Sequence, residues 1–384
     1  MDSELATQIE QLAISQGAHS VGFVSAQIFE RARKTLTERR EQGLASSMQF
    51  TYRNPERSTD PFQLLPSAKS IVALTFPYAS YGSGDCDGAK NYEDYPGVGE
   101  GVVGRFARHD YYSDLREVLD SIRALLKEND FKAVTSADSN ALVDREVAWA
   151  AGLGWYGKNS QLLTPERGSW VVLGEVVTNA DLVDVDPEPL GTDCGSCTRC
   201  IDLCPTEAIV ADGVIDANRC LAWLVQAPDA IPIEFRTAVG TRIYGCDECA
   251  EVCPPSETGL KQANPVSVEP YRDTVDLFWM LAATDAELLK ECNAWYIPKR
   301  DPNFLRRTAL VCLGNSAVEN DIRTRSTLAR YLTDDNPMLV THGIWAARRL
   351  GFDDLIEPAE INQRDFGEIQ AELDADVTPR LLDA

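Results

Sequence analysis

Positive charge is scarce in this chain of 384 residues. Lysine and arginine together number 36, against 60 aspartates and glutamates, which gives a formal net charge of −24. A protein this acidic repels nucleic acids and anionic membrane surfaces at long range. Any contact with a nucleic acid would therefore require a local basic patch.

Long hydrophobic runs are also lacking. The clearest apolar stretches, such as Leu277 to Ala283, are far too short to span a bilayer. The start of the chain, Met1 to Ala18, has no basic segment of a secretory signal, and Leu5, Ile9 and Leu12 recur at helical spacing. We therefore predict an amphipathic helix at the start of a cytoplasmic protein with no membrane partner. In that compartment, clustered cysteines bind metal more often than they form disulfides.

Cysteines are concentrated in one segment. Eight of the eleven lie between Cys194 and Cys253. The first four form a C-x2-C-x2-C-x3-C-P run, which is typical of bacterial ferredoxins with 4Fe–4S clusters, and in two-cluster proteins its fourth cysteine ligates the other cluster. The run from Cys246 to Cys253 has the same ending but lacks its first cysteine, and the upstream Cys220 can replace it.

This pattern predicts two 4Fe–4S clusters. One is held by Cys194, Cys197, Cys200 and Cys253, and the other by Cys204, Cys220, Cys246 and Cys249. Zinc knuckles are the alternative, but eight cysteines with two C-x3-C-P endings fit iron–sulfur better. Cys86, Cys292 and Cys312 follow no ligand pattern, and Cys312 is predicted to lie in a core. Two clusters form a path for electrons, which directs attention to a reaction centre elsewhere in the chain.

Composition divides the chain into three segments, which predicts an α+β multidomain protein. The segments are 1–180, of mixed α/β character, 181–265, which contains the cysteines, and 266–384, which is helical. In the first segment we expect strands at Ser20–Val24, Ser70–Phe76 and Trp170–Val177, helices at Asp114–Leu126 and Leu142–Ala151, and a loop from Tyr78 to Gly104.

The helical segment contains a weak repeat. Leu305–Gly314 and Val340–Gly351 share a Leu-Gly ending about 37 residues apart, a period that suits the paired helices of HEAT-type repeats. Two unrelated core helices are the alternative.

Several motifs, in their joint order, resemble the epoxyqueuosine reductase family. They are Val143–Asn159, Gly168–Glu175, the ferredoxin run and Arg242–Cys249. The similarity extends from about Met48 to Pro254 and, more loosely, through the C-terminal helices. It implies an enzyme related to reductive dehalogenases that uses cobalamin to reduce epoxyqueuosine, at the wobble position of tRNA, to queuosine. This is the last step of queuosine biosynthesis.

The resemblance also implies an assignment for each segment. Residues 1–180 would form a nitroreductase-like α/β domain that binds cobalamin, 181–265 a ferredoxin-like domain with two clusters, and 266–384 HEAT-like repeats that contact tRNA. The family binds base-off cobalamin without a histidine ligand, which fits a chain with three histidines. An external low-potential electron donor and a monomeric enzyme are further expectations.

Asp138 matches the proton donor of the family. Opening an epoxide to an olefin consumes two electrons and two protons, and a carboxylic acid can protonate the leaving oxygen. Burial should raise the pKa of such an acid, so that it stays partly protonated near neutral pH. The alternative is that Asp138 caps a helix that begins near Ala141.

Binding residues are carried over from the same resemblance. The cobalamin contacts are Tyr52, Arg105, Asp138, Lys158, Asn159, Ser160, Leu162, Leu173, Ala222, Ile231, Asp247 and Glu248. Residues 291–350 contain nine basic and six acidic side chains, a local balance of +3, which suits phosphate contacts. Within them Lys299, Arg300, Arg306 and Arg307 are predicted to contact tRNA, and solvated helix faces with local ion pairs are the alternative.

Two other functions remain open at this point. A corrinoid reductase of small molecules, similar to reductive dehalogenases, would lack the tRNA-binding repeats. An electron-transfer module without an active site would not need about 180 residues of α/β domain before its clusters.

Overall fold

The structure is a computed structural model that describes residues 2–78, 99–262, 272–317, 321–356, 367–375 and 377. These residues form two compact units, each built from separate stretches of chain. The first contains residues 2–78, 109–220 and 247–262, and the second contains 99–108, 221–246 and the described residues from 272 onward. The units interleave along the sequence, unlike the three successive segments predicted from composition. No helix in the described ranges is long and apolar enough to cross a membrane.

An antiparallel sheet with the strand order β1-β2-β7-β4 forms the centre of the first unit. Its strands are β1 (Ser20–Ser25), β2 (Ser70–Pro77), β4 (Ala133–Ala137) and β7 (Val171–Thr178). The three predicted strands are confirmed, with ends that differ by at most one residue. The apolar β2 and β7 occupy the two central positions, where both faces are covered. The shorter β4 mixes small and polar residues, so its sequence carries a weaker strand signal.

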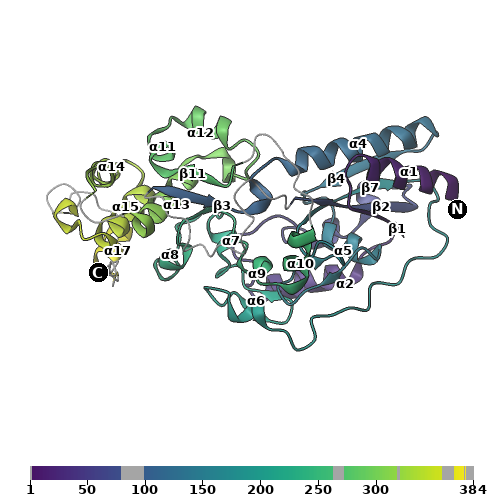
Figure 1. Ribbon diagram of the computed structural model, residues 1–384, viewed down its shortest axis with the longest axis horizontal. Helices are drawn as coiled ribbons and strands as arrows, with labels where there is room; N and C mark the ends of the chain where they lie inside the picture. Colours follow the sequence, from purple (N-terminus) through teal and green to yellow (C-terminus); the bar gives the residue numbers. More distant parts are fainter. Residues whose placement is uncertain are drawn as a thin grey trace. The chain divides into compact units, whose positions relative to one another are not determined.

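Helices cover both faces of this sheet (Figure 1). On one side lie α1 (Ser3–Ser15) and α4 (Tyr111–Glu128), and on the other α2 (Glu30–Glu41) and α5 (Asp144–Ala150). Successive residues of β7 point to opposite faces. A Cβ at Gly174 would meet Leu119 of α4, whereas Val177 packs in a cluster with Val147 of α5. Glu175, two residues before Val177, therefore faces α5. The three predicted helices are confirmed, with shifted ends.

Short elements make up the rest of the first unit. They are α3 (Pro55–Ser58), β5 (Trp155–Tyr156), β6 (Leu162–Leu163), α6 (Arg199–Asp202), β8 (Ile209–Ala211), β9 (Val214–Ile215), α9 (Glu248–Glu251) and α10 (Pro254–Gln262). Strands β5 and β6 pair with each other, as do β8 and β9. Helix α6, in the first cysteine run, packs against α9, in the second. The fold thus brings together two cysteine runs that lie far apart in the sequence.

The second unit combines a small sheet with a group of helices. Strand β3 (Glu100–Val103) is central and pairs in parallel with β10 (Arg242–Tyr244) and antiparallel with β11 (Thr274–Asp276). The predicted loop Tyr78–Gly104 is therefore wrong at its end, because the apolar Gly101–Val103 stretch finds two partner strands. Residues 79–98 of that prediction lie outside the described residues.

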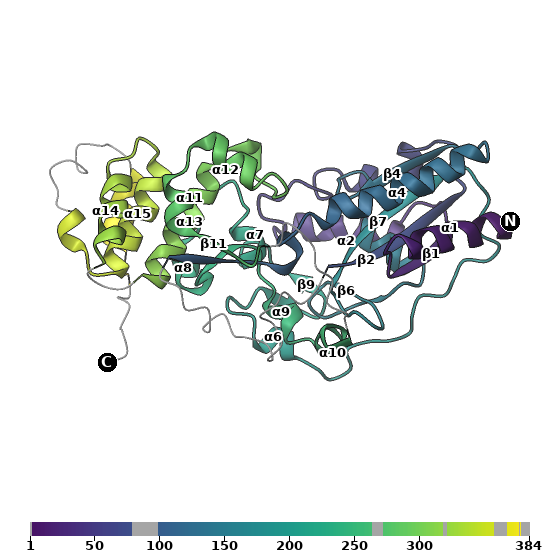
Figure 2. The same cartoon turned by 45° about the horizontal axis from the view of Figure 1, so that its top comes forward.

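Helices follow in close succession along the second unit. They are α7 (Leu221–Leu224), α8 (Ile233–Val239), α11 (Leu277–Ala282), α12 (Asp285–Glu291), α13 (Asn303–Ser316), α14 (Ile322–Leu332), α15 (Pro337–Arg349) and α17 (Gly367–Asp374). Figure 2 shows α13 between α11 and α15, and α14 beside α15. The predicted helix at Leu305–Gly314 is confirmed as part of α13, and that at Val340–Gly351 is confirmed by α15, which ends two residues earlier, at Arg349. Their assignment to HEAT-type repeats stays a prediction.

Candidate functional site

Four of the predicted cluster ligands gather in the first unit. Burial, together with the neighbouring thiols of Cys253, Cys194 and Cys197, raises the pKa of the Cys200 thiol to about 11. Burial also raises the pKa of Cys253, with additional contributions from Cys194 and Cys197. Such effects weaken with distance, so the four thiols are neighbours in the fold, and Cys194 packs against Cys253. These four residues are the set predicted for one cluster, and four cysteine thiolates are the ligands that a 4Fe–4S cluster requires.

A hydrogen-bonded junction fixes the position of Cys253. Ser256 of α10 donates hydrogen bonds to the Cys253 sulfur from both its backbone and its side chain. The Ser256 hydroxyl also accepts the backbone N–H of Ser169 at 3.1 Å, and its carbonyl accepts the indole N–H of Trp170 at 2.8 Å. Gly168 has a φ of +58°, and a Cβ there would lie 2.4 Å from the Ser256 backbone. The residues just before β7 thus hold the last cysteine of the second run.

The grouping of the other four predicted ligands stays a prediction. Cys204 accepts a hydrogen bond from the backbone N–H of Ala208 at 3.2 Å. Cys220 follows β9, Cys246 follows β10 and Cys249 lies in α9.

The cysteines outside the motifs differ from the predicted cluster ligands in their surroundings. Cys292 and Cys312 are buried in the hydrophobic core of the second unit, as predicted for Cys312. Burial raises the pKa of Cys292 to about 11 and raises that of Cys312 as well, so both remain protonated thiols of low reactivity. Cys86 lies outside the described residues.

Asp138 occupies an unusual backbone position after β4. Its φ is +47°, which is uncommon for a residue other than glycine, and its backbone N–H donates to Oδ2 of Asp144 at 3.1 Å. Although the residue is open to solvent on one side, partial burial raises the pKa of its carboxyl, while the positive charges of Arg116 and Arg145 oppose the rise. Helix α5 begins only at Asp144, after Val143. The capping alternative for Asp138 is therefore wrong.

A turn at residues 157–160 connects Asp138 with the cysteine segment. Ser160 has a φ of +61°, and its carbonyl accepts a hydrogen bond from Nη1 of Arg145 at 3.2 Å. The carboxamide of Asn159 donates to the carbonyl of Cys249 at 3.1 Å. A continuous set of contacts therefore runs from Asp138 through the start of α5 and the turn to a predicted cluster ligand.

The other residues predicted to contact cobalamin are dispersed over the first unit. Lys158 pairs with Asp212 at 3.2 Å, Leu162 is buried in β6, and Leu173 is half-buried in β7. Tyr52 is half-buried after α2, and Asp247 and Glu248 lie at the start of α9. Around the turn an ammonium, a carboxamide and a hydroxyl lie close in sequence to apolar Leu162. This mixture of polar and apolar groups is typical of cofactor sites.

Three predicted cobalamin contacts belong to the second unit. Arg105 follows β3 and Ala222 lies in α7, and both are half-buried. Ile231 is fully buried. Its N–H donates to Nε2 of His342 at 3.2 Å, and its carbonyl accepts from Nε of Arg236 at 2.8 Å. The predicted contact is wrong for Ile231, because the residue is fully enclosed in the core and its N–H is already engaged with His342.

The basic residues predicted to contact tRNA divide into two kinds. Lys299 and Arg300 are exposed and have φ values of +52° and +55°. Arg307 is fully buried, and its guanidinium donates to four backbone carbonyls, those of Leu224, Val225, Ala227 and Asp229. Burial lowers the pKa of Arg307 to about 9. The prediction of a tRNA contact is wrong for Arg307, because a side chain engaged in the core cannot reach a phosphate.

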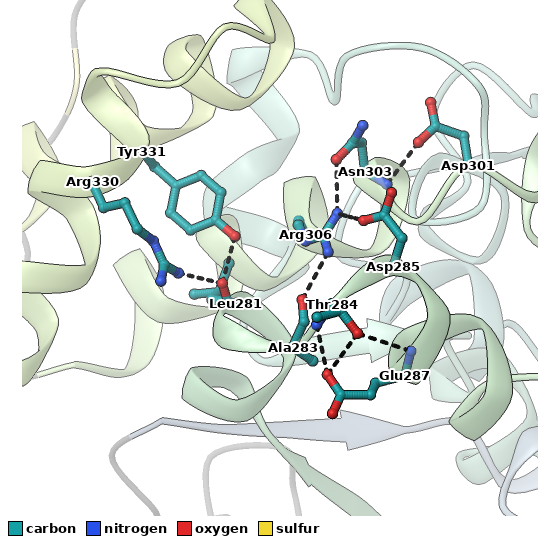
Figure 3. Close-up of polar contacts among 10 residues, drawn as sticks. All are labelled: Leu281, Ala283, Thr284, Asp285, Glu287, Asp301, Asn303, Arg306, Arg330 and Tyr331. Carbon is teal, nitrogen blue, oxygen red and sulfur yellow. Dashed lines mark hydrogen bonds and ion pairs between the residues drawn. The ribbon is translucent and has the colours of Figure 1, made fainter.

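Arg306 is committed to packing between helices (Figure 3). Its Nη1 pairs with Asp285 at 2.7 Å and donates to Asn303 at 3.0 Å, while Nη2 donates to the carbonyl of Ala283 at 2.9 Å. The side chain is 11% exposed. Arg306 thus joins α13 to the connection between α11 and α12, and its charge is already paired within the protein.

Two acidic residues near Asp138 were not predicted as parts of the site. Asp144 is the first residue of α5, and Glu175 lies in the middle of β7 with 1% exposure. Their carboxyl groups are hydrogen-bonded to each other. A sequence signal for one of them exists, because Glu175 is the single charged residue within the apolar stretch Trp170–Val177. Isolated acids in buried strands require a partner.

Comparisons with known proteins identify relatives of this chain. Residues 193–256 match the family described as a 4Fe-4S double cluster binding domain. An epoxyqueuosine reductase from Bacillus cereus is 34% identical over 352 residues, which cover 90% of this chain and 88% of the relative. One from Lactococcus garvieae is 32% identical over 354 residues, which cover 90% of this chain and 96% of the relative.

Solved structures of epoxyqueuosine reductases are also similar to this chain. A crystal structure of epoxyqueuosine reductase with an epoxyqueuosine-modified stem loop of tyrosine tRNA superposes with a TM-score of 0.83 at 29% identity, covering 96% of this chain and 97% of that one. A structure of the Bacillus subtilis enzyme, with its catalytic loop swung out of the active site, superposes with a TM-score of 0.82 at 28% identity and the same coverage.

Proposed function

The chain belongs to the epoxyqueuosine reductase family, and from this premise we propose that it reduces epoxyqueuosine to queuosine at the wobble position of tRNA. The conversion removes the epoxide oxygen and forms an olefin. It consumes two electrons and two protons and releases one water. An enzyme for this reaction needs a source of single electrons, an acid near the epoxide oxygen and a surface for tRNA.

The observation that carries the proposal is the set of contacts between Asp138 and the cysteine segment. Asp138 has a carboxyl of raised pKa, and the contacts through Arg145, Ser160 and Asn159 lead to Cys249. A partly protonated acid can donate to the oxygen that leaves the carbon skeleton. Its openness to solvent on one side suits a group that must meet a large substrate and be reprotonated from water.

We also propose that the chain holds two 4Fe–4S clusters and cobalamin. Cys194, Cys197, Cys200 and Cys253 fit one cluster, since their thiols lie close together. The turn with Lys158, Asn159 and Ser160 and the neighbouring Leu162 fits the polar and apolar parts of a corrin, whereas Ile231 does not. When bound, these groups accept electrons from an external low-potential donor and make them available to the substrate. The residues of the turn would orient the corrin relative to Asp138.

For the tRNA, the exposed Lys299 and Arg300 are the candidates that remain from the predicted set. Both side chains are exposed, in contrast to Arg306 and Arg307. A relative has been crystallised with an epoxyqueuosine-modified stem loop. Phosphate contacts by such residues would position the anticodon without reading its sequence.

The test is a turnover assay with the full chain. The protein is reconstituted anaerobically with iron, sulfide and cobalamin, and an epoxyqueuosine-containing anticodon stem loop is offered with a strong reductant. Queuosine formation, measured by mass spectrometry of the digested RNA, is the expected result. A fully loaded protein that forms no queuosine would contradict the proposal. A protein that instead reduces only small organohalides would belong to the alternative class of corrinoid reductases.

The Asp138→Asn variant is the matched control for the acid. It preserves the size of the side chain and the backbone N–H, so it should keep the fold and the content of iron and cobalamin. Its turnover should fall by roughly 100-fold or more, since general acid catalysis contributes about 10²- to 10⁴-fold. Turnover equal to that of the unmodified chain would remove Asp138 from the proton-donor role.

A further inference from the structure

Two carboxyl groups meet in the interior behind Asp138. Asp144 opens α5, and Glu175 lies on the face of β7 that α5 covers. Their side chains are hydrogen-bonded to each other. Oδ1 of Asp144 and Oε1 of Glu175 are both buried, and no donor of the described residues reaches either atom. Two ionised carboxylates cannot make a hydrogen bond, because both groups only accept. The arrangement therefore requires one proton between them.

The remaining oxygens of this pair are occupied by fixed partners. Ser136 donates to Glu175, its neighbour in the register of β4 and β7. The Ser136 hydroxyl lies 3.1 Å from that of Ser139, in the loop that follows Asp138. Oδ2 of Asp144 accepts the backbone N–H of Asp138 at 3.1 Å. The pair thus contacts the Asp138 loop directly at the backbone N–H of Asp138 and, through Ser136, at Ser139.

The charged groups around the pair come from α4, α5 and the loop. Asp138 and Arg145 lie beside Asp144, and Tyr112 and Arg116 of α4 face the same region. Burial raises the pKa of Asp144 and of Glu175. Asp144 raises the pKa of Glu175 further, whereas the hydrogen bond to Glu175 partly offsets the rise at Asp144. A buried pair of this kind binds one proton firmly and carries a single negative charge over a wide pH range.

From this geometry we propose that Asp144 and Glu175 form a positioning pair that shares one proton and holds the Asp138 loop in the conformation that presents its carboxyl. The role of the pair in catalysis rests on the proposed function. The shared proton does not depend on that function. The proton remains on the pair and is not transferred to the substrate. Its role is to let two acids pack together, so that Oδ2 of Asp144 is free to anchor the left-handed backbone at Asp138.

Vibrational spectroscopy tests the shared proton without any turnover. The full chain is measured by infrared spectroscopy near pH 8, where exposed carboxyls are ionised, and the carbonyl band of a protonated carboxylic acid is quantified. The unmodified chain should show this band, and it should be lost in both Glu175→Gln and Asp144→Asn. The Asp138→Asn variant controls for the third nearby acid and should retain the band. A missing band in the unmodified chain, or an unchanged band in both amide variants, would overturn the proposal.

Turnover separates positioning from general stability. Glu175→Ala removes the partner, so Asp144 ionises, hydrates and loosens its hold on the loop. The value of kcat should fall by roughly 10- to 100-fold, with little change in KM. Glu175→Gln should regain most of this loss, because its amide can donate to Oδ1 of Asp144 while its carbonyl accepts from Ser136.

The pH profile gives the decisive comparison. Turnover of the unmodified chain should fall when the pair loses its proton at high pH, and this limb should be missing in Glu175→Gln, whose amide cannot ionise. If Glu175→Gln were as inactive as Glu175→Ala, or kept the same limb, the positioning role would be wrong. If the unmodified chain had no turnover at all, the proposed function would be wrong. The infrared result would still show whether Asp144 and Glu175 share a proton.

Discussion

Cys253 illustrates how one ligand position depends on residues outside the cysteine motifs. Its neighbours Cys194, Cys197 and Cys200 come from the first run, and its sulfur is held by Ser256. The spacing of the cysteines predicted this grouping, because the fourth cysteine of each run belongs to the other cluster. The hydrogen bonds of Ser256 could not be predicted, since they depend on how α10 packs against the start of β7.

At this position we predict a partial loss of iron. Cys253→Ala should lower the iron content of the reconstituted protein from about eight to about four atoms per chain, because only one 4Fe–4S cluster loses a ligand. Iron and sulfide analysis together with electron paramagnetic resonance of the reduced protein would measure it. The control is Cys312→Ala, which removes a buried cysteine from the other unit and should keep all the iron. Loss of both clusters, or of neither, would contradict the assigned ligand set.

The Asp144–Glu175 pair also predicts how stability depends on pH. Burial raises the pKa of Asp144 to about 7 and raises that of Glu175. Both values are higher in the folded than in the unfolded chain, so the stabilisation is complete below about pH 4 and is lost as the pH rises. The contribution of Asp144 is lost by about pH 7, and that of Glu175 is lost only at higher pH. Between about pH 5.5 and 7 the free energy of unfolding should fall by roughly 2 kcal/mol from Asp144 alone, and it should fall further above pH 7 as long as Glu175 keeps its proton.

Urea unfolding, followed by circular dichroism at several pH values, would measure this dependence. The Glu175→Gln variant is the control, because it cannot share a proton, and its stability should vary less over the same range. An identical slope in both proteins would assign the effect to other groups.

At the scale of elements, β7 serves both halves of the site. Ser169 and Trp170, just before the strand, contact Ser256 and thereby Cys253, and the middle of the strand carries Glu175 behind the Asp138 loop. The strand was predicted from its apolar run. Its connections were not, because hydrophobic periodicity indicates that a strand is buried and not what it is buried against.

Gly168 tests the junction at the start of this strand. Gly168→Ala should lower the free energy of unfolding by about 2–4 kcal/mol, since it adds both the strain of a left-handed backbone and a clash with Ser256. It should also reduce iron content, because α10 carries Ser256 and follows Cys253 directly. Gly43→Ala is the matched control, with a φ of +74° and nothing within 4 Å of the added Cβ. If both variants lost equal stability and kept their iron, the junction would have no part in holding Cys253.

At the scale of the whole molecule, a net charge of −24 has to be reconciled with a polyanionic substrate. The structure reduces the number of basic residues available for tRNA. Arg307 is buried, Arg306 is paired with Asp285, and Arg325 is paired with Asp354. Counting charges along the sequence predicted a basic segment but could not tell surface residues from those engaged in packing.

We predict that stem-loop binding depends on Lys299 and Arg300 and on salt. Affinity should fall as salt rises, and each alanine substitution should reduce the slope of log affinity against log salt by about 1. Fluorescence anisotropy with a labelled stem loop would measure both effects. Lys34→Ala, at an exposed position of α2, is the control and should leave the slope unchanged. Unchanged slopes in Lys299→Ala and Arg300→Ala would place the phosphate contacts elsewhere.

The main outline of this protein could be predicted from sequence, and the reasons are physical. Strand and helix periodicity identified the central strands and the major helices, and cysteine spacing identified the cluster segment. The interleaving of the two units could not be predicted, because strand pairing between β3 and β10 depends on residues far apart in the chain. The Asp144–Glu175 pair could not be predicted for a related reason, because the two side chains meet only when β7 and α5 are packed together.

The interleaved chain has a consequence for biosynthesis. The central sheet of the first unit is complete once Thr178 has left the ribosome, since its last strand is β7. Strand β3 emerges earlier, yet its partners β10 and β11 follow only after the first cysteine run. The nascent chain therefore carries an unpaired apolar strand while the ligands of both clusters are still being translated. The second sheet can therefore close only late in synthesis. Iron and sulfide are inserted during the same late period, when the last cysteines are translated.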